Sequence, residues 1–172
     1  MIDGNFNLRK ILISTSPLTT SIFLIFLDSV PFYLVLDDSL KTQFGFIAIY
    51  IWIGINPDSI RPVNILIFGL LIDILNNFFF GFSTFFLSLV LFCQKKDQGI
   101  FFGSEFKKNW MKFFFFILFF NLCASILKKI FDDKIIISAK EFISINLISL
   151  ILFPILFIII NNINKELKIY AE

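Results

Sequence analysis

Apolar blocks alternate with short polar segments along most of this chain. Several blocks approach the roughly 20 residues that a helix needs to cross a bilayer. We predict six helices, over residues 17–36, 42–55, 63–77, 79–93, 110–127 and 142–160. The predicted fold is an all-α integral membrane protein, in which about six transmembrane helices form one compact bundle and residues 1–172 make a single domain.

The polar segments between the apolar blocks indicate where the helices end. Two prolines and an arginine within residues 56–62 predict a firm stop and a loop after the second helix. The helices predicted over 63–77 and 79–93 are short for a full crossing. This pair is compatible with two tilted spans, a tight hairpin or a partly re-entrant hairpin.

Composition supports the membrane class, because 58% of the residues are hydrophobic and soluble domains are usually about 45–50% apolar. The polar start of the chain carries Arg9 and Lys10 before an apolar run that continues to Leu36. A signal peptide begins in the same way, but no Ala-x-Ala site follows. We therefore interpret this segment as a retained first membrane helix.

The distribution of basic residues predicts the orientation. With six spans, one side of the membrane carries ten basic residues and the other five, so the positive-inside rule places both termini in the cytoplasm. The ten are Arg9, Lys10, Arg61, Lys95, Lys96, Lys107, Lys108, Lys112, Lys165 and Lys168, and the five are Lys41, Lys128, Lys129, Lys134 and Lys140.

Few residues offer chemistry. The chain has no histidine, and its two cysteines, Cys93 and Cys123, lie in separate apolar blocks, which argues against zinc, haem or histidine-based catalysis. We find no glycine-rich phosphate loop, no paired carboxylates in a soluble cleft and no nucleophile with a base. We therefore expect no enzyme activity, cofactor, metal or nucleic-acid partner.

Asp73 is the most informative residue, since it interrupts the apolar block over 63–77. A carboxylate at membrane depth should face protein or water rather than lipid. Gly69, Asp73, Asn76 and Asn77 are spaced to share one helix face, which suits close packing and interhelical hydrogen bonds. This polar stripe is either a hydrogen-bonded cluster that fixes helix packing, which we favour, or a binding pocket or proton site.

Possible partners of Asp73 lie on other predicted helices. They are Tyr50, Trp52, Asn121, Ser125, Asn146 and Ser149, and the sequence does not select among them. A second acidic residue, Asp28, fits either an intramembrane or an interfacial position.

A set of spaced residues resembles a known family. It comprises Tyr50-x-Trp52, then Asn56-Pro57, then Gly69-x-x-x-Asp73 and finally Gly81. This pattern, together with the length and hydropathy, resembles the MreD family of bacterial rod-shape proteins. The match covers residues 50–92, about a quarter of the chain.

The resemblance implies a non-enzymatic scaffold in the bacterial cytoplasmic (inner) membrane. Its partners would be an MreC-like periplasmic protein and, through the elongation complex, an MreB-like filament, a RodA-like glycosyltransferase and a penicillin-binding transpeptidase. The implied fold is similar to the six-helix S components of vitamin transporters. An alternative function is therefore substrate binding in small-molecule uptake, although the first predicted helix lacks the Ala-x-x-x-Ala-like face that often docks such subunits.

Overall fold

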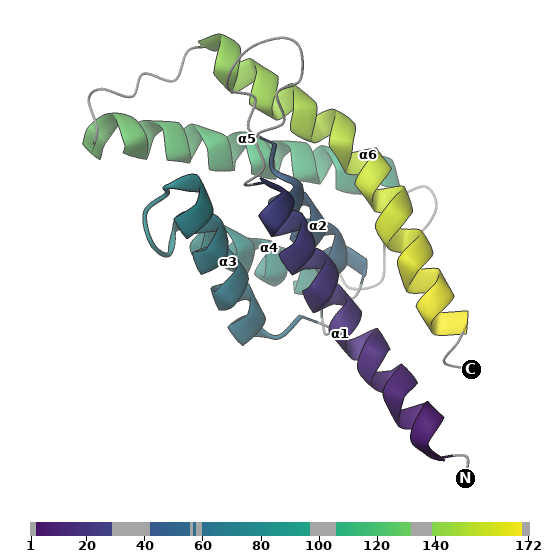
Figure 1. Ribbon diagram of the computed structural model, residues 1–172. Coiled ribbons are helices and arrows are strands. Elements are labelled where there is room, and N and C mark those ends of the chain that lie inside the picture. Colours follow the sequence, from purple (N-terminus) through teal and green to yellow (C-terminus); the bar gives the residue numbers. More distant parts are fainter. Residues whose placement is uncertain are drawn as a thin grey trace.

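The computed structural model describes residues 3–28, 42–55, 57, 60–96, 106–131 and 139–169. Within these residues the chain forms helices and no strand (Figure 1). The helices are α1 (Asp3–Asp28), α2 (Phe44–Ile55), α3 (Pro62–Asn76), α4 (Phe82–Lys96), α5 (Phe106–Phe131) and α6 (Ala139–Ile169). The prediction of an all-helical chain is confirmed for this part of the molecule.

The helix boundaries differ most from the predicted ranges at α1, which begins at Asp3 rather than near residue 17 and includes Pro17. Residues 29–36 of the predicted range lie outside the described residues. α6 likewise continues to Ile169, past the predicted end at 160. Hydropathy marks where the chain becomes apolar, whereas backbone hydrogen bonding can extend a helix beyond that point into polar sequence.

Two helices of the described chain are long and apolar enough to cross a membrane, namely α5 and the Ala139–Glu166 part of α6. The other apolar helical stretches are shorter. α3 and α4 have 15 residues each, and at about 1.5 Å per residue such a helix covers less than the roughly 30 Å hydrocarbon core.

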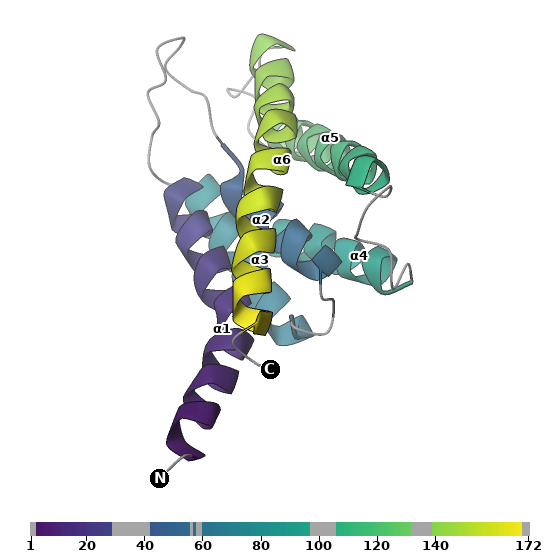
Figure 2. The same ribbon diagram turned by 90° about the vertical axis from the view of Figure 1, so that its right-hand side faces the viewer.

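The central helix is α2, in which every residue from Gly45 to Ile53 is buried. Its sequence is apolar all round, as expected of a helix enclosed by others. It packs against α1, α4 and α6, while α3 pairs with α4 and α1. In both views α5 runs across the direction of α6, so the six helices are not all aligned (Figures 1 and 2).

Aromatic rings connect α5 to the rest of the core. The ring of Phe120 lies 4.8–5.7 Å, centroid to centroid, from four other rings, those of Phe46, Phe78, Phe82 and Phe86. Pairs at such separations add to the energy of burial. Phe120 therefore joins α5 to α2, to α4 and to the turn before α4.

We predict that Phe120→Ala destabilises the fold by about 3 kcal/mol or more, because it opens a cavity where these rings meet. The matched control is Phe115→Ala on the same helix, since Phe115 is 63% exposed and its removal should cost far less. Thermal unfolding of both variants in detergent measures the difference. Equal losses in the two variants would contradict a packing role for Phe120.

Candidate functional site

Asp73 is fully buried, and its carboxylate accepts two backbone hydrogen bonds across the turn between α3 and α4. The N–H of Gly81 donates to Oδ2 of Asp73 with a nitrogen–oxygen distance of 2.8 Å. The N–H of Ser83 donates to Oδ1 at 2.9 Å. One side chain near the end of α3 thus accepts from the residue just before α4 and from the second residue of α4.

This contact satisfies a specific need of α4. The first N–H groups of a helix have no partner within the helix, and a Ser, Thr, Asp or Asn just before the helix usually accepts from them. Gly81 occupies that position here and has no side chain to offer. The carboxylate of Asp73 replaces the missing cap from a neighbouring helix and also complements the positive end of the α4 dipole.

The backbone of Asp73 shapes the same turn. Its carbonyl accepts from the N–H of Asn77 and from that of Phe78, the latter at 2.9 Å, which closes α3. Asn77 has φ 51° and ψ 44°, a left-handed conformation that asparagine adopts more readily than most residues. Gly81 has φ +89°, where a side chain would be strained. The turn therefore depends on these residue types.

Gly69 lies one helical turn before Asp73 and is buried where α3 meets α4. A Cβ atom at this position would overlap both the side chain and the backbone of Thr84. The absence of a side chain thus lets the two helix backbones approach closely, as small residues do in membrane helix pairs. Gly69 and Asp73 both face α4.

The other two residues of the predicted polar stripe lie elsewhere. Asn76 is half-buried, and its Nδ2 donates to the carbonyl of Ile72 at 3.1 Å. Asn77 is exposed and contributes its backbone conformation. The structure brings Gly69 and Asp73 together at the α3–α4 contact, whereas Asn76 and Asn77 diverge from it.

The aromatic residues of the family pattern are buried in α2. The ring of Tyr50 packs edge-on against Phe113 of α5 at 5.1 Å and against Phe153 of α6 at 6.0 Å. The Nε1 of Trp52 donates to Oγ1 of Thr20 at 2.9 Å, which ties α2 to α1. Pro57 is a half-buried turn residue after α2. These contacts place Tyr50 and Trp52 on different sides of the central helix.

Four side chains named as possible partners of Asp73 form contacts of their own, away from its carboxylate. Nδ2 of Asn121 donates to Oδ1 of Asn146 at 3.0 Å, and Nε2 of Gln43 donates to Oδ1 of Asn121 at 2.7 Å. The hydroxyl of Ser125 donates to the Asn121 carbonyl at 2.7 Å, and the hydroxyl of Ser149 approaches Oε1 of Gln43 at 3.5 Å. We call these five residues the amide network.

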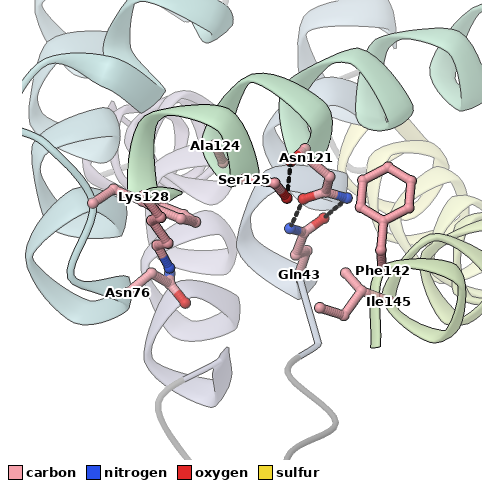
Figure 3. Close-up of a pocket in the computed structure, with 9 residues that line it drawn as sticks. Gln43, Asn76, Asn121, Ala124, Ser125, Lys128, Phe142 and Ile145 are labelled. Carbon is pink, nitrogen blue, oxygen red and sulfur yellow. Dashed lines mark hydrogen bonds between the residues drawn. The ribbon is translucent and has the colours of Figure 1, made fainter. Parts of the chain in front are cut away.

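The amide network connects α5 and α6 to the residue before α2, and a cavity of about 60 Å³ lies beside it (Figure 3). Sequence reasoning did not identify Gln43. In the sequence, Gln43 is distinguished only as a polar residue directly before a uniformly apolar helix, and this position does not specify a partner.

Asp28 repeats the arrangement of Asp73 at a second helix. Its Oδ1 accepts from the N–H of Phe44 at 2.6 Å, and its Oδ2 accepts from the N–H of Gly45 at 2.8 Å. These are the first two residues of α2. A Cβ atom at Gly45 would also overlap Ile25, so a glycine again permits close helix packing beside the capping carboxylate.

The hydrogen bonds of the two carboxylates, Asp28 and Asp73, give them a mainly structural role. Each one holds a helix N-terminus through two backbone donors, which fixes the angle between consecutive helices. Among the described residues, no three His, Cys, Asp or Glu side chains gather in a way that could hold a metal ion.

Comparison with known proteins adds no relative: no family model, no curated protein and no solved structure matches this chain.

We predict that Asp73→Asn is tolerated better than Asp73→Leu. Asparagine keeps one acceptor for the α4 donors and should cost about 1 kcal/mol, whereas leucine leaves two buried N–H groups without an acceptor and should cost about 3 kcal/mol. Thermal unfolding in detergent, monitored by the fraction of protein that stays monodisperse, measures both. Equal losses would show that the negative charge, rather than hydrogen bonding, is what the site requires.

Proposed function

We propose that this chain is a non-enzymatic scaffold of the bacterial cytoplasmic membrane, similar to the MreD family, and that it helps to organise peptidoglycan synthesis during cell elongation. In this proposal all six helices lie in the membrane, with α3 and α4 as a short, tightly turned pair. Both termini lie in the cytoplasm. The start of α1 and the end of α6 lie toward the same end of the molecule, which is consistent with this topology (Figures 1 and 2).

The observation that carries the proposal is the coupling between residues of the family pattern. Asp73 binds Gly81 through its carboxylate, and Gly69 sets the distance between the same two helices. Three residues that are spread over thirteen positions of sequence therefore act as one structural unit. Such a unit explains why a scaffold would need these residue types at this spacing without any catalytic role.

A membrane setting is further supported by large apolar side chains on the outer faces of the two long helices. On α5, Phe115 is 63% and Ile130 66% exposed, and on α6, Ile151 is 62% exposed. Water would disfavour apolar surface on this scale, whereas lipid tails or a partner helix accommodate it.

The partners follow from the same proposal. The direct partner would be an MreC-like periplasmic protein, bound through its membrane span. An MreB-like filament, a RodA-like glycosyltransferase and a penicillin-binding transpeptidase would associate through the complex. The work of this chain would be helix–helix binding, for which a rigid α1–α4 core with capped helix ends provides a fixed surface.

The alternative, substrate binding for vitamin uptake, is not supported by the cavity found among the described residues. Pockets for ligands of that size usually have volumes of roughly 300–1,000 Å³. The cavity beside the amide network has about 60 Å³ and cannot hold such a molecule without rearrangement.

We predict that depletion of this gene rounds or widens the cells and disperses new wall synthesis. Cell width and the pattern of fluorescent wall labelling, scored by microscopy, measure the effect. Re-expression of the wild-type gene from a second locus should restore both and is the control for specificity. The chain should also co-purify in mild detergent with the MreC-like protein of the same organism.

Unchanged cell shape after depletion, together with no association in mild detergent, would overturn the proposal. A nutrient requirement in cells of normal shape would instead favour the uptake alternative.

A further inference from the structure

Pro154 interrupts the backbone hydrogen bonding of α6 at one carbonyl. In an α-helix each carbonyl accepts from the N–H group four residues later, and proline has no N–H group. Pro154 lies inside α6, which continues past it to Ile169. The carbonyl of Leu150, four residues before the proline, therefore cannot receive its usual hydrogen bond from within the helix.

Trp110 of α5 supplies the missing donor. Its indole Nε1 donates to the carbonyl oxygen of Leu150, with a nitrogen–oxygen distance of 3.1 Å. A donor from a neighbouring helix that satisfies such a freed carbonyl allows proline inside a helix in an apolar environment. The acceptor of this indole is thus the carbonyl that Pro154 deprives of its backbone donor.

Aromatic rings position Trp110 on both sides of this hydrogen bond. Phe106, one turn earlier in α5, stacks on Trp110 at 6.4 Å and contacts Phe157 of α6 at 5.0 Å, centroid to centroid. Phe113, in the next turn of α5, stacks on Phe153 of α6 at 4.5 Å. The rings of α5 therefore contact α6 both before and after the proline, with the indole bond between these contacts.

The parts of α6 on either side of Pro154 have separate partners. Before the proline, Asn146 accepts from Asn121 of α5 within the amide network. After the proline, Leu156 and Ile160 are buried in the core. A helix that lacks a backbone hydrogen bond at one position bends most easily there, so these two parts of α6 can move relative to each other at the proline.

We propose that α6 is hinged at Pro154 and that the indole of Trp110 is the latch that holds this hinge in one arrangement. With the indole bond formed, the carbonyl of Leu150 is satisfied and α6 behaves as one continuous helix. With the bond broken, this carbonyl loses its donor, and the segment after the proline gains freedom to tilt. The inference follows from the backbone chemistry of α6 and does not depend on the proposed role in cell shape.

The test is a double-mutant cycle on the purified full-length chain in a neutral detergent. Trp110→Phe keeps a ring beside Phe106 but removes the indole donor. Pro154→Ala supplies the backbone N–H group that the carbonyl of Leu150 lacks, so it should make the latch unnecessary. Thermal unfolding, and backbone hydrogen exchange across residues 148–158, are measured for the wild type, both single variants and the double variant.

We expect Trp110→Phe to lower the unfolding midpoint by about 2–6 °C and to raise hydrogen exchange in this segment roughly tenfold, because a carbonyl loses its donor. In the Pro154→Ala background the same substitution should cost at most half as much and leave the exchange nearly unchanged. The proposal is overturned if the loss in that background exceeds half of the loss in the wild type. It is also overturned if Trp110→Phe leaves the midpoint or the exchange of the wild type unchanged.

Two further variants separate the latch from ordinary packing. Trp52→Phe removes the other indole of the chain, whose acceptor is Thr20 of α1, and its cost should be the same in both backgrounds. Pro154→Ser restores the backbone N–H group with a different side chain, and it replaces Pro154→Ala if that variant does not fold. A full requirement for Trp110 in the serine background would equally contradict the proposal.

Discussion

The backbone N–H groups at the start of a helix need acceptors, and at a buried helix end water cannot supply them. Two aspartates meet this need, Asp28 at the start of α2 and Asp73 at the start of α4. Each lies near the end of the helix before it. The remaining packing depends on these two contacts, because they set how consecutive helices are joined.

Glycine and aspartate act together at both joints. Gly69 lets α3 approach Thr84 of α4, and Gly45 lets α2 approach Ile25 of α1. Close approach brings the carboxylate within reach of the next helix, and the hydrogen bonds in turn hold the helices close. A carboxylate that accepts two backbone donors also offsets part of the cost of its own burial. Each of these acids is therefore stabilised in a buried position by backbone donors.

The long helix α5 is held by a different kind of contact. Its rings, above all Phe120, reach α2 and α4 across a distance that small side chains would leave open. Beside these rings, the amide network links α5 to α6 and to Gln43. The two kinds of contact that hold α5 have different properties. Ring packing supplies buried area, whereas directed amide hydrogen bonds specify which residues pair. The proposed scaffold role would use the ring packing for rigidity.

The sequence by itself determined the helical class, the shortness of α2, α3 and α4, and the face of α3 that carries Gly69 and Asp73. Hydropathy and a period of 3.6 residues report these features directly. The residues of α2 are apolar on every side, and the structure encloses this helix among the others. The sequence did not determine the start of α1, since polar residues continue a helix without any change in hydropathy that marks its end.

Only the tertiary structure decided the partners. Asp73 was expected to face side chains of α2, α5 or α6, and its carboxylate instead meets the backbone of Gly81 and Ser83. Asn121 meets both Gln43 and Asn146. Periodicity tells which face of a helix a residue occupies, but a partner depends on which helix lies opposite and how it is rotated. Those two quantities are set by the packing of the whole chain, and no local stretch of sequence contains them.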